Sequence, residues 1–201
     1  MGRKRTYSRE TVVEKAMGLF WRNGYKATSV GELVRETGLN TASMYKEFGD
    51  KDGLFLESLR YYRGHVIGPR YQILRDHPDF GGVETFLSNV MTGAVRSEYK
   101  GCLMMNHLAQ RHVIAPDAAL EIGAFCDEIE SLVETALRNA RTDGDIGPES
   151  DPATLASFVV FCVHGTVLYG RHDEKKHFLP DIYKLVMGAL RGPEPPGRIL
   201  K

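Results

Sequence analysis

Apolar residues recur every three or four positions along almost the whole chain, and no stretch alternates apolar with polar residues for long. The first spacing gathers apolar side chains on one face of a helix, whereas sustained alternation would indicate a half-buried strand. The pattern therefore predicts an all-α protein of about nine helices.

Three short helices are expected in the first fifty residues, because each has a recognisable start or stop. Ser29 and Glu32 have the spacing of a capping box, in which each side chain bonds to a backbone N–H at the other residue, and Asn40 is a favourable N-cap. Gly24 and Gly38 are expected to end the first two helices. The expected bounds are residues 8–23, 30–37 and 41–48.

A fourth helix over residues 51–67 is expected to connect this head to a larger helical body, and Gly68-Pro69 should break or kink it. The body is expected to add helices over about residues 83–99, 103–112, 116–141 and 152–170, and a last one after residue 180. The predicted domains are a head over residues 1–50, a body over residues 51–191 and a disordered tail, rich in Pro and Gly, over residues 192–201.

Charge is distributed unevenly, although the formal net charge of the whole chain is zero. Residues 1–48 hold nine Lys and Arg against five Glu, a net charge of +4, so the remainder carries −4. The overall neutrality argues against a coat protein that is basic throughout. The asymmetry indicates a head that binds a polyanion on a body that does not.

The cysteines Cys102, Cys126 and Cys162 lie far apart, without the spacing of a metal site or a disulfide framework. Such a set is expected of reduced thiols in the cytoplasm. We see no signal peptide, and the most apolar run, residues 158–163, is far shorter than the roughly 20 residues that cross a bilayer. We therefore expect a soluble cytoplasmic protein that does not bind a membrane.

The second and third predicted helices, with Gly38 and Leu39 between them, have the pattern of a helix-turn-helix, whose second helix enters the major groove of duplex DNA. The third helix carries small polar residues, with Tyr45 and Lys46 beside them. Small side chains let the helix backbone approach the bases, while hydroxyl, amide and ammonium groups reach bases or phosphates. The head is therefore predicted to bind double-stranded DNA.

Residues 11–55 contain the motifs Gly24-Tyr25-Lys26-Ala27-Thr28-Ser29-Val30, Thr37-Gly38-Leu39, Ser43-Met44-Tyr45, Phe48-Gly49-Asp50-Lys51 and Leu54-Phe55. Together, at these spacings, they resemble the TetR/AcrR family of transcription regulators. The resemblance implies a homodimer whose chains have a three-helix DNA-binding head and a fourth helix that acts as a lever. It also implies a variable body that binds a small molecule and dimerises through its last two helices.

The resemblance assigns roles on the head. Tyr45 and Lys46 would bind phosphates, as would Thr28, and Lys51 would anchor the start of the fourth helix to the DNA backbone, while Thr41 and Ser43 would face bases. The complete set of predicted DNA-contacting residues is Thr28, Ser29, Asn40, Thr41, Ala42, Ser43, Tyr45, Lys46 and Lys51.

The head departs from the common family pattern in two places. Asn40-Thr41-Ala42 stands where many members have Ser-Lys-Gly, and Lys46-Glu47 stands where paired His is frequent. The operator sequence therefore does not follow from the resemblance. Glu47 either accepts a hydrogen bond from a cytosine or is simply solvated. Residues 3–5, Arg-Lys-Arg, are either an arm that reaches the minor groove or phosphates, or a solvated terminus.

A ligand pocket is predicted in the body, where apolar walls meet a few polar groups. The candidate lining residues are Met91, Val95, Tyr99, Cys102, Met104, His107, Leu108, Cys162, Thr166 and Tyr169. Alternatively, these side chains are ordinary core. Cys102 lies in a segment similar to the sixth helix of TetR-type regulators that respond to electrophiles, unsaturated acids or oxidants, although it could equally be a small buried hydrophobe. The predicted ligand is small and largely apolar or electrophilic.

The dimer interface is predicted on the last two helices, where apolar stripes could assemble across a two-fold axis. Its candidate residues are Ala156, Val160, Val163, Ile182, Leu185, Val186 and Ala189. Alternatively, both stripes are core within one chain.

The sequence contains no His pair at metal-ligand spacing, no phosphate loop and no nucleophile elbow. We therefore expect that the protein binds no metal or cofactor and is not an enzyme.

The expected function is repression of transcription. A dimer would place two recognition helices about 34 Å apart on a near-palindromic operator, and a bound inducer would swing the fourth helix and spoil that spacing. The alternatives are an enzyme and a structural DNA-binding protein without a ligand.

Overall fold

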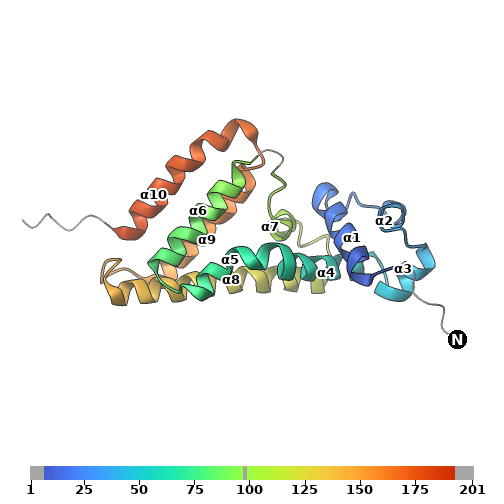
Figure 1. Cartoon of the computed structure of the whole chain (residues 1–201), viewed down its shortest axis with the longest axis horizontal. Helices are drawn as coiled ribbons and strands as arrows, with labels where there is room; N and C mark the ends of the chain where they lie inside the picture. The colour runs from blue at the N-terminus through green and yellow to red at the C-terminus, as the bar shows by residue number, and fades with distance from the viewer. Residues whose placement is uncertain (1–6, 97–98, 193–201) are drawn as a thin grey trace, which may run out of the picture. The chain divides into compact units, whose positions relative to one another are not determined.

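The computed structural model describes residues 7–96 and 99–192. All regular structure within them is helical, which confirms the all-α prediction (Figure 1). The elements are α1 (Arg9–Asn23), α2 (Val30–Thr37), α3 (Thr41–Phe48), α4 (Lys51–Tyr61), the π-helix η1 (Tyr62–Ile67), α5 (Gly68–Asp76), α6 (Phe80–Ala94), α7 (Leu103–Leu108), α8 (Pro116–Asp143), α9 (Pro152–Tyr169), the 3₁₀-helix η2 (Asp173–Phe178) and α10 (Leu179–Arg191).

The three helices of the head begin at, or one residue after, the residues that the sequence predicts, each with an N-cap side chain that accepts a backbone hydrogen bond. The Ser8 hydroxyl accepts a hydrogen bond from the N–H of Thr11 at the start of α1. At α2 the Ser29 N–H donates to Glu32 Oε2 at 2.8 Å, and the Glu32 N–H donates to Ser29 Oγ at 3.2 Å. Both halves of the capping box are therefore present. α3 begins in the same way, with Asn40 Oδ1 as its cap.

Of the two outcomes predicted for Gly68-Pro69, a break or a kink, the break is wrong, because Lys51–Asp76 is helical without interruption. The π-helix η1 immediately precedes the proline, and the Gly68 N–H there donates to the carbonyl of Arg63, five residues earlier. A π-turn re-routes the backbone hydrogen bonds, so the missing N–H and bulky ring of proline interrupt less than in a regular α-helix. With this run counted as one helix and the short 3₁₀-helix η2 left out, the described residues form nine helices, as predicted.

Other boundaries also differ from the sequence prediction. α6 starts earlier than expected and ends at Ala94, and α7 ends at Leu108. The predicted arm over residues 3–5 and nearly all of the predicted tail lie outside the described residues.

The chain divides into two compact units. The first unit contains residues up to Pro69 together with Cys102–Cys126, and the second contains Arg70–Gly101 together with the residues from Asp127 onward. The segment Cys102–Cys126, which holds α7 and the start of α8, thus packs with the head although it is distant in sequence.

An aromatic cluster forms part of the core of the first unit. The rings of Phe20 on α1 and Phe55 on α4 meet edge to face, with centroids 4.9 Å apart, and both side chains are fully buried. Tyr25 lies 4.9 Å from the Phe55 ring. Contacts of this kind add to the stabilisation from burial alone and fix α1 against α4.

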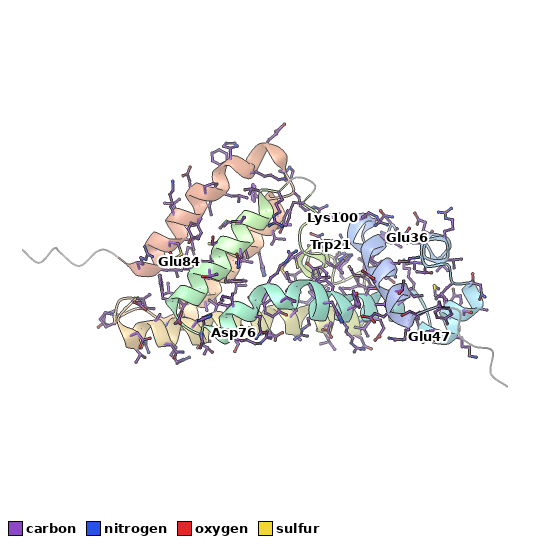
Figure 2. The ribbon with its side chains drawn as sticks, viewed as in Figure 1. Trp21, Glu36, Glu47, Asp76, Glu84 and Lys100 are labelled. Atoms are coloured by element: carbon purple, nitrogen blue, oxygen red, sulfur yellow. The ribbon has the colours of Figure 1, made fainter. Side chains whose placement is uncertain are left out.

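In the second unit α6 packs against α9 and α10 (Figure 1). Arg191 at the end of α10 forms an ion pair with Glu84 of α6, labelled in Figure 2, with an N–O distance of 3.2 Å. By length and composition α9 could span a membrane, and 39% of it is buried inside the protein. A single helix of this kind is weak evidence for a membrane span, because core helices of soluble proteins pass the same test, and α9 contacts α6 and α10.

Candidate nucleic-acid interface

The third helix presents a polar face to solvent and an apolar face to the head. Met44 and Phe48 are buried, with exposed fractions of 1% and 8%. The exposed residues are Asn40, Thr41, Ala42, Tyr45 and Lys46, and Ser43 is half-buried. Six of the nine predicted DNA-contacting residues therefore lie on this helix or at its N-cap, and five of the six are exposed, which is the arrangement that a recognition helix needs.

A tight turn sets the angle between α2 and α3. Gly38 adopts φ 74° and ψ 7°, a left-handed conformation that glycine takes at little cost, and its N–H donates to the Val34 carbonyl at 3.0 Å. The Leu39 N–H donates to the Thr37 hydroxyl, and the Leu39 side chain is buried. These contacts hold the two helices of the predicted helix-turn-helix in a fixed geometry.

Two predicted DNA-contacting residues, Thr28 and Ser29, form hydrogen bonds within the head. The Thr28 side chain is fully buried, and its hydroxyl donates to the Gly24 carbonyl at 2.8 Å. The Ser29 hydroxyl belongs to the capping box with Glu32. In this structure both side chains position the start of α2 through bonds to their own chain.

Lys51 has a comparable internal role. Its ammonium group donates to the carbonyls of Tyr25 and Thr28, each at 3.1 Å, and lies 4.1 Å from the centroid of the Tyr25 ring. The Tyr25 hydroxyl donates in turn to the Asp52 carboxylate. Lys51 thus joins the first residue of α4 to the turn between α1 and α2, which is a different task from the DNA-backbone anchor suggested by the family resemblance.

Glu47, labelled in Figure 2, forms an ion pair within the head. Its carboxylate lies 3.3 Å from the Nε of Arg9, and its side chain is only 12% exposed. Arg9 also pairs with Glu57 of α4 at 2.6 Å. The arginine therefore ties α1 to both α3 and α4. The interpretation of Glu47 as a simply solvated charge is wrong, and contact of Glu47 with a cytosine stays a prediction.

The candidate ligand-binding residues fall into both units. Cys102, Met104, His107 and Leu108 belong to the first unit, and the others belong to the second. In the second unit an apolar cavity of about 400 Å³ lies between α9, η2 and α10. It is lined by Phe161, Cys162, Gly165, Thr166, Tyr169, Phe178, Leu179 and Ile182. Three of the predicted residues, Cys162, Thr166 and Tyr169, thus share this cavity.

Two further candidates, Met91 and His107, are occupied by protein contacts. Met91 is buried behind the cavity wall, where its sulfur accepts a hydrogen bond from the Thr166 hydroxyl at 3.4 Å. His107 is buried in the first unit, with both ring nitrogens within hydrogen-bond distance of backbone groups. Nothing in the sequence indicated these hydrogen bonds of His107.

The predicted interface residues also divide between core and surface. The core of the second unit contains Ala156, Val160, Val163 and Val186. Ile182, Leu185 and Ala189 are exposed along one side of α10. On α9 the exposed large apolar residues are instead Phe158, Phe161, Leu168 and Tyr169, which periodicity did not single out because this helix is apolar on most sides. We call Phe161, Leu168, Tyr169, Ile182 and Leu185 the α9–α10 apolar face.

Comparison with known proteins begins with the head. The family model for "Bacterial regulatory proteins, tetR family" matches residues 12–58, the segment that contains α1, α2, α3 and most of α4. The chain belongs to the TetR family.

Similarity to curated TetR-type proteins extends beyond the head. The chain is 28% identical over 176 residues to the transcriptional repressor ComR of Escherichia coli, covering 85% of this chain and 82% of ComR. It is 31% identical over 122 residues to the repressor BdcR of the same organism, covering 60% of this chain and 62% of BdcR. This TetR-family chain is therefore similar to repressors in its body as well as in its DNA-binding head.

Solved structures show the same fold. A cysteine-substituted form of the TetR-family regulator CifR, in a complex with 26-base-pair double-stranded operator DNA, matches with a TM-score of 0.76 and 25% identity over 92% of this chain and 98% of that one. The reduced form of Escherichia coli NemR matches in fold, with a TM-score of 0.75 at 15% identity, over 89% of this chain and 94% of NemR. The chain is a TetR-family DNA-binding transcription regulator.

Proposed function

We propose that this chain is a homodimeric, cytoplasmic repressor that binds a near-palindromic operator through α3 and leaves it when a small ligand binds in the second unit. The polar face of α3 carries the proposal, because Thr41, Tyr45 and Lys46 are exposed together on a helix whose opposite side is anchored by Met44 and Phe48. The CifR complex supports it, since that protein of the same fold is bound to operator DNA.

Two substitutions on α3 test DNA recognition. DNA selected from a random pool supplies the probe, and fluorescence anisotropy gives the affinity at several salt concentrations. Lys46→Ala should weaken binding to all sequences and reduce the salt slope of the dimer by about two, because each of the two subunits loses one phosphate contact. Thr41→Ala should mainly change sequence preference, by about 1–3 kcal/mol at the base pair that it faces.

Lys184→Ala is the matched control for loss of a lysine charge. Lys184 is exposed on α10 in the second unit, where it pairs with Asp181. Its removal should leave both the affinity and the salt slope unchanged. If wild-type protein binds the selected DNA no more tightly than random DNA, or if both α3 variants bind like wild type, α3 is not the recognition helix.

The α9–α10 apolar face supports the proposed homodimer. Phe161 and Leu185 are exposed to 76% and 69%, and large apolar side chains gathered on one surface of a soluble protein indicate an interaction site. The proposed occupant is the same face of a second copy, because a two-fold axis brings each helix pair against its own equivalent.

The cavity between α9, η2 and α10 supports a small and largely apolar ligand, which would lie next to the proposed dimer contact because Phe161, Tyr169 and Ile182 belong to both the cavity and the α9–α10 apolar face. Its walls are mostly apolar, with the Thr166 hydroxyl and the Cys162 thiol as polar groups. Burial raises the pKa of Cys162, so little of the reactive thiolate is present at neutral pH. We therefore favour non-covalent binding over capture of an electrophile at this cysteine. Mass spectrometry after treatment with N-ethylmaleimide tests the choice, since rapid labelling of Cys162 would favour the electrophile.

Release by a ligand has a thermodynamic signature. If the ligand lowers the affinity for DNA by a given factor, then DNA must lower the affinity for the ligand by the same factor. A ligand found by thermal-shift screening should therefore bind less tightly to operator-bound protein than to free protein. Equal affinities would remove the inducer role and leave a DNA-binding protein without this regulation.

A further inference from the structure

A histidine outside the head sequence contacts the turn that precedes the helix-turn-helix. The backbone N–H of Tyr25 donates to the Nε2 of His107 at 3.0 Å, although the two residues are 82 positions apart. His107 is only 1% exposed, and its ring packs against Phe55 with centroids 4.9 Å apart. Both residues belong to the first unit, as does all of α7.

The second ring nitrogen determines which tautomer His107 adopts. Nδ1 lies 2.8 Å from the carbonyl oxygen of Leu103, one helical turn earlier on α7. A carbonyl can only accept, so Nδ1 carries the hydrogen and Nε2 is left with the lone pair that Tyr25 needs. The contact with Tyr25 therefore requires a neutral imidazole.

The backbone of Tyr25 is hydrogen-bonded at both its N–H and its carbonyl oxygen. His107 accepts from its N–H, and Lys51 donates to its carbonyl oxygen, which also accepts from the N–H of Thr28 at 3.3 Å. The next residue, Ser29, caps α2, and α2 in turn positions α3 through the turn at Gly38. The position of Tyr25 thus determines where the helix-turn-helix begins.

We propose that neutral His107 is a positioning residue for DNA binding, which holds the turn between α1 and α2 in the arrangement that presents α3. A proton on Nε2 would set two N–H donors against each other and release the turn. The inference rests on the DNA-binding function and does not require a ligand.

The ionisable groups around this contact come from α4 and from the turn itself. The Lys51 ammonium lies over the Tyr25 ring, Asp52 accepts from the Tyr25 hydroxyl, and the charge of Asp50 also acts on Tyr25. On α7 itself the partner is the uncharged Leu103 carbonyl. The imidazole therefore has a backbone group at each nitrogen, and neither nitrogen pairs with a carboxylate that would stabilise its cation.

Burial lowers the pKa of His107 below the usual 6.5, and the hydrogen bond to the Leu103 carbonyl opposes this only in part. The folded-state pKa is thus lower than the unfolded-state value. The stabilisation by this contact is fully present above pH 6.5 and is lost as the pH falls through the folded-state pKa. DNA affinity should fall over the same acid range.

The experiment compares wild type, His107→Gln and His107→Leu by DNA anisotropy from about pH 8 to about pH 5. Glutamine places an amide oxygen near the Nε2 position and does not titrate, so His107→Gln should bind within about twofold of wild type at neutral pH and lose the acid decline. His107→Leu leaves the Tyr25 N–H without its acceptor and should bind about tenfold or more weakly at every pH.

Two other histidines are controls. His65→Gln removes an exposed histidine of η1 and should reproduce the wild-type pH profile. His164 lies in the second unit, and burial lowers its pKa as well. If His164→Gln removes the acid decline and His107→Gln does not, the proposal is overturned.

A measurement on the wild-type protein tests the proposal even if His107→Leu fails to fold. Amide hydrogen exchange at Tyr25 in the wild-type protein should lose protection in the same pH range in which DNA affinity falls, after correction for the intrinsic rate. Protection that persists there, or a flat wild-type affinity profile, overturns the role of His107. Sequence-specific DNA binding at neutral pH would still stand, so this failure is distinct from failure of the proposed function.

Discussion

Replacement of Phe161 by glutamate tests the proposed dimer at its most exposed large apolar residue. The side chain is 76% exposed and lies on α9, where it is one of the residues that line the apolar cavity. Because so little of it contacts its own chain, Phe161→Glu should leave the fold intact, and association is measured without ligand because this residue also lines the cavity. Circular dichroism and thermal melting would check that the fold is retained.

The magnitude follows from the area that a partner would cover. Full burial of a phenylalanine side chain contributes about 2 kcal/mol, so covering the exposed three quarters contributes about 1.5 kcal/mol. In a two-fold symmetric dimer both subunits bury this residue, so the substitution removes about 3 kcal/mol of association free energy. The dimer dissociation constant should therefore rise about 100-fold. The introduced carboxylate, once removed from water, would weaken the dimer further.

Sedimentation velocity over a concentration series measures this change. Leu120→Glu is the matched control, because Leu120 is 71% exposed on α8 but lies outside the α9–α10 apolar face. The control should dimerise like wild type. A wild-type protein that is monomeric at micromolar concentration, or a Phe161→Glu variant with unchanged association, would refute the assignment of this face.

Two further predictions concern stability. Lys51→Met removes both hydrogen bonds from the ammonium group to the α1–α2 turn and should lower the free energy of unfolding in urea by about 2 kcal/mol. Lys46→Met, at an exposed position on α3, is the control and should leave the free energy of unfolding unchanged. Equal urea midpoints for the two variants would contradict the internal role of Lys51. Gly82→Ala should lower the melting temperature, with a cost of about 2 kcal/mol, because a Cβ there would lie 1.9 Å from the His77 carbonyl oxygen. Gly81→Ala is its control, since the nearest atom to a Cβ there is a side-chain oxygen at 3.3 Å, and a similar loss at both sites would show that the clash is not the cause.

The parts of the fold that depend on neighbouring residues were predictable from the sequence. Ser29 with Glu32 and Asn40 with Ser43 interact over three positions, so their side chains reveal where α2 and α3 begin. α5 was missed because Pro69 normally ends a helix, and nothing in the local pattern indicates that η1 accommodates it. A π-turn depends on how the surrounding helices pack, which a single sequence does not display.

The site was predictable only in its outward-facing part. The exposed positions of α3 follow from the apolar spacing of Met44 and Phe48, which shows which side must face the core. Thr28 and Lys51 are polar residues in a surface-like segment, and their inward bonds depend on Gly24 and on Tyr25 in the folded turn. α9 is apolar on most sides, so periodicity could not tell the buried Val160 from the exposed Phe161.

The bond between Tyr25 and His107 bears on how such regulators can be recombined. A chimera that joins residues 1–50 of this chain to the body of another regulator would separate the turn from the imidazole that accepts its N–H. Unless the new body supplies an acceptor at the same place, the transplanted head would lose affinity for its own operator despite an unaltered recognition helix. Head and α7 segment should therefore be exchanged together, and natural fusions of unrelated heads and bodies would need a compensating residue at this junction.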